Sequence, residues 1–239
     1  MPTFFEAQLA PNLNEIQLSA PEAHHAANVL RLKPGEWVRV ANGAGLIAEG
    51  EIVQAESRKT AVRLHRFDTL PKSASMLTLA VSPVKSAERN DWLVEKATEL
   101  GVDRLVFLQT ERMEKARLKT ARLEAKSISA LKQCGRGWLP RIEPLTELSA
   151  WLVQQDRQAD KWMVAHCMET VPLPLYRAAA SASSFTLFIG PEGDFTPQEV
   201  DLLQEHGATP VSLGQLILRT ETAAIAGLVQ LQLLREMAL

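Results

Sequence analysis

The sequence predicts an α/β protein made of a small β-barrel followed by a parallel sheet with helices on both faces. Short β-rich segments separated by turns fill the chain up to about residue 70, and strand-like and helix-like segments alternate from Met76 onward. The polar stretch 68–75, which contains Pro71, separates these two patterns. We therefore expect two domains, at 1–70 and 71–239.

Five short segments of the first part are rich in β-forming residues, and turns at Lys33-Pro-Gly and Asn42-Gly-Ala-Gly separate several of them. The predicted strands are 3–9, 16–18, 36–40, 46–53 and 60–67. One helix is expected at 23–32, because Ser19 and Glu22 have the spacing of a capping box. Five strands and one helix are typical of small barrels, an architecture often used to bind RNA.

The second part has the alternation expected of a parallel sheet. The predicted strands are 76–82, 104–108, 162–165, 185–189 and 210–213. The predicted helices are 88–100, 118–133, 148–155, 197–206 and about 221–237. We expect Gly101 to end the first helix in a left-handed conformation, and Thr196, Pro197 and Glu199 to begin the fourth as N-cap, first residue and capping-box acid. The last helix is apolar on almost every side, which predicts burial in its own domain or against a second subunit.

The composition excludes several classes of protein. The chain has 239 residues, of which 46% are hydrophobic, and a net charge of −2, so it is not expected to be disordered. Its two cysteines, Cys134 and Cys167, form no C-x-x-C pair, which argues against a disulfide framework, a zinc finger or another metal site. No apolar run approaches the roughly 18 residues of a membrane span, and the first residues do not resemble an export signal. We expect a soluble, cytoplasmic protein.

Basic side chains are concentrated in one stretch of the chain. Between residues 112 and 141 the acidic residues are only Glu114 and Glu124. The basic residues there are Arg112, Lys115, Arg117, Lys119, Arg122, Lys126, Lys132, Arg136 and Arg141. Several of them recur at helical spacing and would share one face, which could follow the phosphates of a nucleic acid. A solvated helix surface is the alternative interpretation.

Two loops at predicted strand ends carry residues that suggest chemistry. Gly190-Pro-Glu-Gly193 lies between a strand and a helix, at the sheet edge where open α/β sheets bind ligands, although an ordinary turn would also explain it. In the second loop Ile217 and Leu218 are apolar, which is unfavourable unless they cover a ligand or pack in a core. Arg219 precedes the positive end of the last helix, a poor place for a cation unless it faces an anion.

The order of these motifs resembles a known family. Gly190-Pro-Glu-Gly193 followed by Leu213-Gly-x-x-Ile-Leu-Arg-Thr-Glu-Thr-Ala223 is similar to the paired signature of the SPOUT methyltransferases, specifically of the ribosomal RNA small subunit methyltransferase E family. Further similar segments are His25-x-x-x-Val-Leu-Arg31, Glu95-Lys-Ala-Thr-Glu-Leu-Gly-Val102 and Gln133-Cys-Gly-Arg136. The chain departs from the family pattern at Asp194, where glycine is usual, at Leu216, where arginine is common, and at Lys132, where glutamate is frequent.

The resemblance implies a PUA-like RNA-binding β-barrel at 1–70 and a SPOUT methyltransferase domain with a trefoil knot at 71–239, in a homodimer. It implies S-adenosyl-L-methionine as the cofactor and N3 of a uridine in 16S rRNA, within the small ribosomal subunit, as the target. The residues expected around the cofactor are Ala165, His166, Ile189, Gly190, Pro191, Glu192, Gly193, Leu213, Gly214, Ile217, Leu218, Thr220, Thr222 and Ala223.

Two residues are candidates for catalysis. We expect Arg219 to orient the target nucleotide and to stabilise the charge that develops as N3 loses its proton. Glu221 is the candidate general base, and its alternative role is that of a first-turn acid of the last helix. The residues expected to contact RNA are Arg31, Lys85, Arg112, Lys119, Arg122 and Arg136.

Other functional classes fit less well. No G-x-G-x-x-G opens a helix, as a Rossmann enzyme would need, and the P-loop motif of NTPases is missing from the sequence. A non-catalytic RNA-binding factor of ribosome assembly remains an alternative, although it would not need the apolar loop around Ile217. A SPOUT methyltransferase that acts on another RNA is the third possibility.

Overall fold

The chain divides into two compact units, which are described separately. The computed structural model describes residues 1–155, 160–167, 173–179, 182 and 184–237. The first unit comprises Met1–Lys72 and Ile128–Leu139, and the second comprises Ser73–Ser127 and Pro140–Leu239. The end of one helix from the middle of the chain therefore packs with the amino-terminal part.

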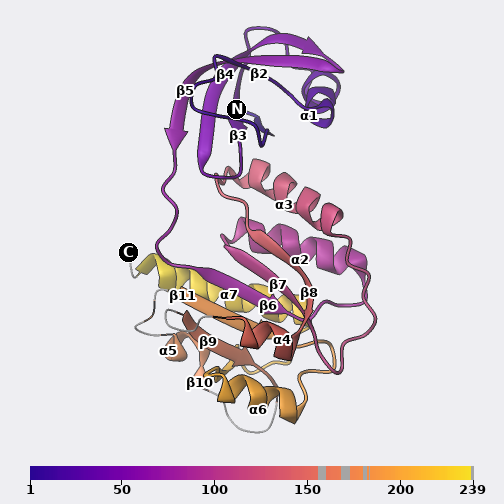
Figure 1. Cartoon of the computed structure of the whole chain (residues 1–239), viewed down its shortest axis with the longest axis vertical. Helices are drawn as coiled ribbons and strands as arrows, with labels where there is room; N and C mark the ends of the chain where they lie inside the picture. Colours follow the sequence, from indigo (N-terminus) through magenta and orange to yellow (C-terminus); the bar gives the residue numbers. More distant parts are fainter. Residues whose placement is uncertain (156–159, 168–172, 180–181, 183, 238–239) are drawn as a thin grey trace. The chain divides into compact units, whose positions relative to one another are not determined.

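The first unit contains a five-stranded sheet (Figure 1). Its strands are β1 Thr3–Phe5, β2 Glu15–Gln17, β3 Trp37–Ala41, β4 Leu46–Glu56 and β5 Lys59–Thr69. The order is β1-β3-β4-β5-β2, and every pair is antiparallel except the β1–β3 pair. Strands occur at all five predicted places, but the first is wrong in length, because β1 ends at Phe5 and residues 6–9 are not in a strand. β4 and β5 extend beyond the predicted ranges, because they form one long hairpin that pairs as far as Glu56 and Lys59.

The helix of this unit begins earlier than predicted. It comprises α1, Ala20–His24, and a π-helical turn, η1, His25–Val29. The predicted capping box is wrong, because the side chain of Ser19 accepts no cap hydrogen bond. The carboxylate of Glu22 is buried and instead accepts a 2.6 Å hydrogen bond from Lys132 Nζ. A buried carboxylate without a cation costs more free energy than a helix end without its cap, so Glu22 pairs with Lys132.

The second unit contains a seven-stranded parallel sheet. Its strands are β6 Leu77–Val81, β7 Arg104–Gln109, β8 Arg141–Glu147, β9 Asp160–Ala165, β10 Leu173–Pro174, β11 Ser184–Ile189 and β12 Thr209–Ser212. Their order is β10-β12-β9-β11-β6-β7-β8. The five strands predicted for this part are confirmed and form the interior of the sheet. The edge strands β8 and β10 were not predicted, since β8 is largely polar and contains Pro144, a residue that sheets accept at their edges.

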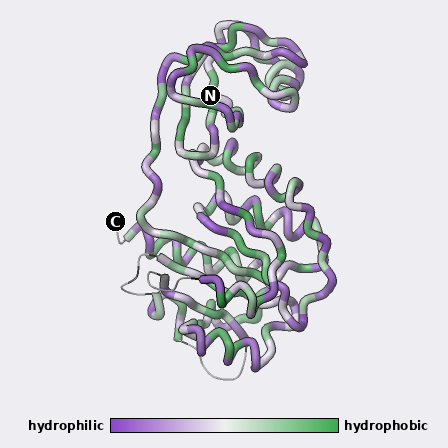
Figure 2. The backbone as a smooth tube through the Cα atoms, viewed as in Figure 1, coloured by the Kyte–Doolittle hydropathy of each residue, from purple (hydrophilic) through white to green (hydrophobic). Residues whose placement is uncertain are grey.

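Helices cover both faces of this sheet (Figure 1). They are α2 Ala87–Glu99, α3 Thr120–Cys134, α4 Leu148–Val153, α5 Leu175–Ala178, α6 Pro197–Glu205 and α7 Thr220–Met237. The odd-numbered Leu77 and Leu79 of β6 pack in one core with α2 and α7, whereas Ala80 packs in another with α4 and α6. Figure 2 shows the hydrophobic strands between these layers. The five predicted helices of this part are confirmed, and the short α5 was not predicted.

The starts and ends of two helices follow the sequence signals. Thr196 Oγ1 accepts a hydrogen bond from the Glu199 N–H (3.2 Å), and Glu199 Oε2 accepts one from the Thr196 N–H (2.8 Å), so the predicted capping box of α6 is confirmed. Gly101 follows α2 with φ +81°, the left-handed conformation that was expected. The capping box fixes where α6 begins, directly after the loop at 190–195.

The last helix is buried along one side only. Ala224, Leu228 and Leu231 lie in the core, and a methyl group at Gly227 would lie 2.3 Å from Leu187 Cδ2, so α7 packs very closely on β11. Leu233 on its other side is 56% exposed. The prediction that the last helix is buried in its own domain is thus confirmed for one side of α7. Among the described helices, none is both long and apolar enough for a membrane span.

Candidate active site

A cavity of about 550 Å³ lies in the second unit, beyond the carboxyl ends of β9, β11 and β12. Three segments form most of its wall: residues 165–167 at the end of β9, the loop that begins at Ile189, and residues 211–220 from the end of β12 to the start of α7. A cavity of this size, between the carboxyl ends of parallel strands, is typical of sites for small ligands.

The cavity brings together nearly all residues that the sequence predicted around a cofactor. Of that set, only Gly193 and Thr222 do not line it. Arg219, a predicted catalytic residue, also lines the cavity and is exposed. The lining residues that sequence reasoning missed are Cys167, Asp194, Val211 and Ser212, whereas Gln215 and Leu216 lie within the segment 213–218 that was expected at the cofactor. The positions of the missed residues beside the predicted segments, and the departure from the family pattern at Asp194, were the available signals.

The loop after β11 folds back tightly on itself. The Asp194 N–H donates to the Pro191 carbonyl (2.9 Å), which closes a turn. A side chain at Gly190 would place its Cβ 2.9 Å from the backbone nitrogen of Phe195, so the turn requires glycine there. The turn brings Glu192 and Asp194 to the cavity wall together.

Asp194 joins two segments of this wall. Its Oδ1 accepts the Phe195 N–H (2.8 Å), and its Oδ2 accepts the N–H of Cys167 (2.7 Å) from the segment after β9. The neighbouring His166 is 9% exposed, and burial lowers its pKa although the charge of Asp194 acts in the opposite direction. His166 is therefore neutral at pH 7. Burial and the charge of Asp194 both raise the pKa of the Cys167 thiol.

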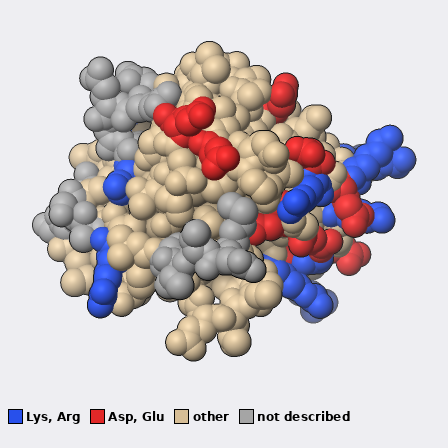
Figure 3. Space-filling model, turned by 90° about the horizontal axis from the view of Figure 1, so that it is seen from below, with Lys and Arg blue, Asp and Glu red and all other residues tan. Residues whose placement is uncertain are grey.

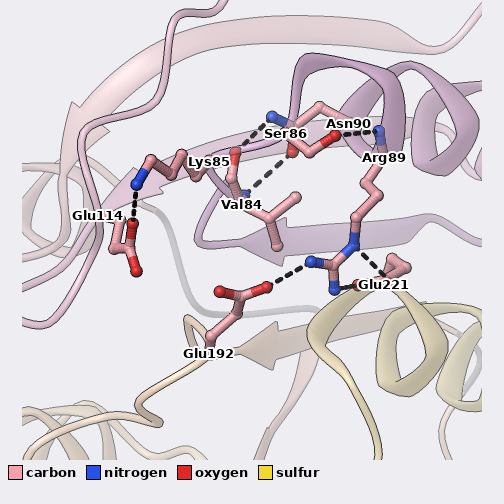
Figure 4. A network of polar contacts seen from close by, with 8 residues as sticks. All are labelled: Val84, Lys85, Ser86, Arg89, Asn90, Glu114, Glu192 and Glu221. Atoms are coloured by element: carbon pink, nitrogen blue, oxygen red, sulfur yellow. Dashed lines mark hydrogen bonds and ion pairs between the residues drawn. The ribbon is translucent and has the colours of Figure 1, made fainter.

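Arg89 links two further parts of the site, as Figure 4 shows. Its Nε donates to Glu221 Oε1 (2.8 Å) and its Nη2 to Glu221 Oε2 (2.5 Å), while its Nη1 donates to Glu192. Arg89 lies in the first turn of α2, where its N–H donates to Ser86 Oγ (3.3 Å). One guanidinium thus holds both the loop after β11 and the first turn of α7. Sequence reasoning missed Arg89, since nothing in its spacing indicates such distant partners.

Glu221 does not line the cavity. Its side chain is 12% exposed, and both carboxylate oxygens accept hydrogen bonds from Arg89. Burial alone would raise its pKa, but the hydrogen bonds and the positive charge of Arg89 outweigh burial, with a smaller contribution from Arg219, and the pKa is lowered. Glu221 is therefore ionised at neutral pH.

The residues predicted to contact RNA have different surroundings. Lys85 forms an ion pair with Glu114 (3.1 Å), and Arg122 Nε donates to Asp91 Oδ2 (2.7 Å). On the right of the face shown in Figure 3, Lys and Arg side chains lie close to Asp and Glu side chains.

The other predicted RNA contacts include two with unusual positions. Arg112 Nη1 donates to the Gly193 carbonyl (2.9 Å), so it supports the loop after β11. Arg31 has φ +53°, an uncommon conformation for a residue other than glycine. Lys119 is exposed and Arg136 half-buried.

Among the described residues, no group of acidic, histidine and cysteine side chains could hold a metal ion.

Two family models match the chain. One, described as an RNA methyltransferase domain, matches residues 71–232, and one described as an RNA methyltransferase PUA domain matches residues 18–63. The first covers more than half of the chain and contains every residue that lines the cavity.

Several relatives are similar over nearly their whole length. The ribosomal RNA small subunit methyltransferase E of Rickettsia conorii is 30% identical over 97% of this chain and 94% of its own. The protein of the same name from Mycobacterium bovis is 31% identical over 87% of this chain and 82% of its own. The crystal structure of a ribosomal RNA small subunit methyltransferase E from Neisseria gonorrhoeae, bound to S-adenosyl methionine, is 28% identical, with a TM-score of 0.88 over 98% of both chains. The chain belongs to the ribosomal RNA small subunit methyltransferase E family of RNA methyltransferases.

Proposed function

We propose that this protein transfers a methyl group from S-adenosyl-L-methionine to N3 of a uridine in 16S rRNA. The observation that carries the proposal is the cavity formed by the loops after β9, β11 and β12, with Arg219 exposed on its wall, in a chain of this family. The S-adenosyl methionine in the Neisseria gonorrhoeae structure supports the choice of cofactor.

The walls of the cavity fit a nucleoside joined to an amino acid. Leu213, Ile217 and Leu218 line the cavity and are not buried, so they offer apolar surface against which an adenine ring could lie. The backbone at Gly190 lies so close to Phe195 that this part of the wall has no room for a side chain. When bound, S-adenosylmethionine supplies a methyl group on a sulfonium, a good leaving group, so the chain mainly has to align the acceptor.

The chain must also promote loss of the N3 proton, because protonated N3 has no free electron pair. We propose that Arg219 contacts the nucleotide at a phosphate or a uracil oxygen and stabilises the negative charge on the base as the proton leaves. Arg219 lies just before α7 and its carbonyl accepts the Ala223 N–H (2.8 Å), so the helix start fixes its backbone.

Glu221 remains our proposed general base. Its lowered pKa keeps it ionised, as a base must be, but Arg89 occupies both of its oxygens. Acting as a base therefore requires Arg89 to release it. Should Arg89 stay in place, Glu221 would instead hold the start of α7.

The remaining features belong to the same proposal. We propose domains at 1–70 and 71–239, a trefoil knot in the second, a homodimer, and action in the cytoplasm on 16S rRNA within the small ribosomal subunit. Half-exposed apolar residues on α7, such as Leu233, support a second copy as the partner of that helix. The proposed RNA contacts are Arg31, Lys85, Arg112, Lys119, Arg122 and Arg136.

Mass spectrometry of nucleosides tests this function. We expect 16S rRNA from cells that lack the protein to lose one N3-methyluridine, wild-type protein to restore it, and Arg219→Ala not to restore it. Calorimetric titration with S-adenosylmethionine should show that wild type and Arg219→Ala both bind the cofactor. Unchanged 16S rRNA methylation in cells without the protein would contradict the target. RNA binding without cofactor binding would instead indicate a non-catalytic assembly factor.

A further inference from the structure

Asp194 has an unusual backbone conformation on the wall of the cavity. Its φ is +61°, in the left-handed region, where a residue with a side chain is disfavoured by about 1–2 kcal/mol relative to the right-handed region. Aspartate tolerates this region better than most residues, because its short side chain can bond the nearby backbone. Both carboxylate oxygens accept hydrogen bonds from backbone N–H groups. One of these groups belongs to Cys167, which follows the end of β9. The strained position thus holds a carboxylate between two loops of the site.

In the parts of the chain that the structure describes, no cation forms an ion pair with Asp194. There its carboxylate accepts hydrogen bonds from the backbone N–H groups of Cys167 and Phe195. Glu192, the other carboxylate on the wall, is paired with Arg89. His166 is neutral at pH 7, so it does not offset Asp194. Arg219 also lines the cavity, but it belongs to the other loop and is exposed to solvent.

We infer that Asp194 is a specificity-determining residue that favours the positively charged methyl donor over its uncharged product. S-adenosylmethionine carries a sulfonium, whereas S-adenosylhomocysteine has a neutral thioether at the same place. A fixed anion on the wall attracts the first and has no such attraction for the second. Selective loss of that attraction after methyl transfer aids product release. The inference rests on the proposed cofactor.

Calorimetric measurement of Kd for both ligands with wild type, Asp194→Asn and Asp194→Gly tests the inference. Asparagine and glycine both tolerate a positive φ, so both variants should fold, which thermal unfolding checks. The ratio of the two Kd values should shift against S-adenosylmethionine by roughly 3- to 30-fold in both variants, a range set by Coulomb attraction over several ångströms. In addition, Asp194→Gly should weaken the binding of both ligands by an equal factor, because the hydrogen bond from the Cys167 N–H to the carboxylate is lost.

The matched control is Asp201→Asn, which removes an exposed carboxylate of α6 that does not line the cavity and should leave the ratio unchanged. If the ratio of the two Kd values is unchanged in Asp194→Asn, whether or not both ligands bind more weakly, the proposed role of Asp194 is overturned. The methyltransferase proposal would remain intact. Failure of the wild-type protein to bind either ligand would overturn both.

Discussion

Arg89 shows how one side chain connects segments that are far apart in the sequence. A guanidinium can bond a carboxylate with two parallel N–H groups and still present a third, which the ammonium of lysine cannot do in a fixed plane. Arg89 uses two groups on Glu221 and one on Glu192. The position of the loop after β11 relative to α7 therefore depends on this residue.

We predict that Arg89→Ala lowers the free energy of unfolding by about 1–3 kcal/mol at pH 7, because the largely buried Glu221 loses its charged partner. Arg89→Lys should be intermediate. A double-mutant cycle with Glu221→Gln, measured by urea unfolding, should show coupling at pH 7. The pKa of Glu221 is lowered, so its contribution is present above the ordinary value of 4.5 and is lost as the pH falls through the folded-state pKa. A coupling energy that stays constant on acidification would contradict this assignment.

At the scale of single elements, α7 is held at both ends by arginines that act differently. Arg89 contacts its first turn, beside the cavity. Near its other end, Arg235 Nη1 donates to Asp103 Oδ2 (2.6 Å) and Nη2 donates to the Gly101 carbonyl (3.1 Å). The Leu77 N–H also donates to Asp103 Oδ2 (2.9 Å), so this carboxylate joins α7 to the start of β6.

Arg235→Ala should therefore destabilise the fold without affecting the cavity. Breaking a largely buried ion pair leaves Asp103 without its cation, and we expect a loss of about 3 kcal/mol in the free energy of unfolding. The affinity for S-adenosylmethionine at 25 °C should change less than twofold, because Arg235 does not line the cavity. Arg177→Ala, which removes an exposed arginine of α5, is the control for charge. A large change in cofactor affinity would show that the two ends of α7 are coupled.

Elements with a strong apolar pattern could be predicted from the sequence, and elements that depend on their neighbours could not. β6 and β11 are buried along their whole length, and their hydrophobic runs are visible without a structure. β8 lies at the sheet edge with a polar sequence, and β10 has only two residues, so neither has a pattern of its own. The capping box at Ser19 failed because Lys132, far along the chain, binds the acid it needed.

The candidate site divides in the same way. The loops at 190–193 and 213–223 could be found, since glycines and exposed apolar residues at strand ends are local signals. The bond from Cys167 to Asp194 and the bonds from Arg89 could not be found, because they arise only when the parallel sheet brings separate strand ends together. At this level the sequence identifies the walls of a cavity but not the contacts that hold them in place.

For the molecule as a whole, a net charge of −2 means that attraction to RNA must come from local groups of cations. The structure distinguishes two kinds among the proposed RNA contacts. Arg122 pairs with Asp91, whose side chain is buried, so its charge is already balanced within the protein. Lys119 is exposed and forms no ion pair in the described parts of the chain. A phosphate would meet an available charge at Lys119 but would compete with a carboxylate at Arg122.

We predict that Lys119→Gln weakens binding to a 16S rRNA fragment and reduces the slope of log K against log salt by about 0.7–0.9, the value for one neutralised phosphate. Arg122→Gln should reduce the slope by less, because few counterions are released when a paired cation exchanges partners. Fluorescence anisotropy at several salt concentrations measures both slopes. Lys59→Gln, which removes a cation of the β4–β5 hairpin outside the proposed set, should leave the slope unchanged. Equal reductions for Lys119→Gln and Arg122→Gln would mean that RNA displaces Asp91, and that internal ion pairs do not determine which cations bind the phosphates.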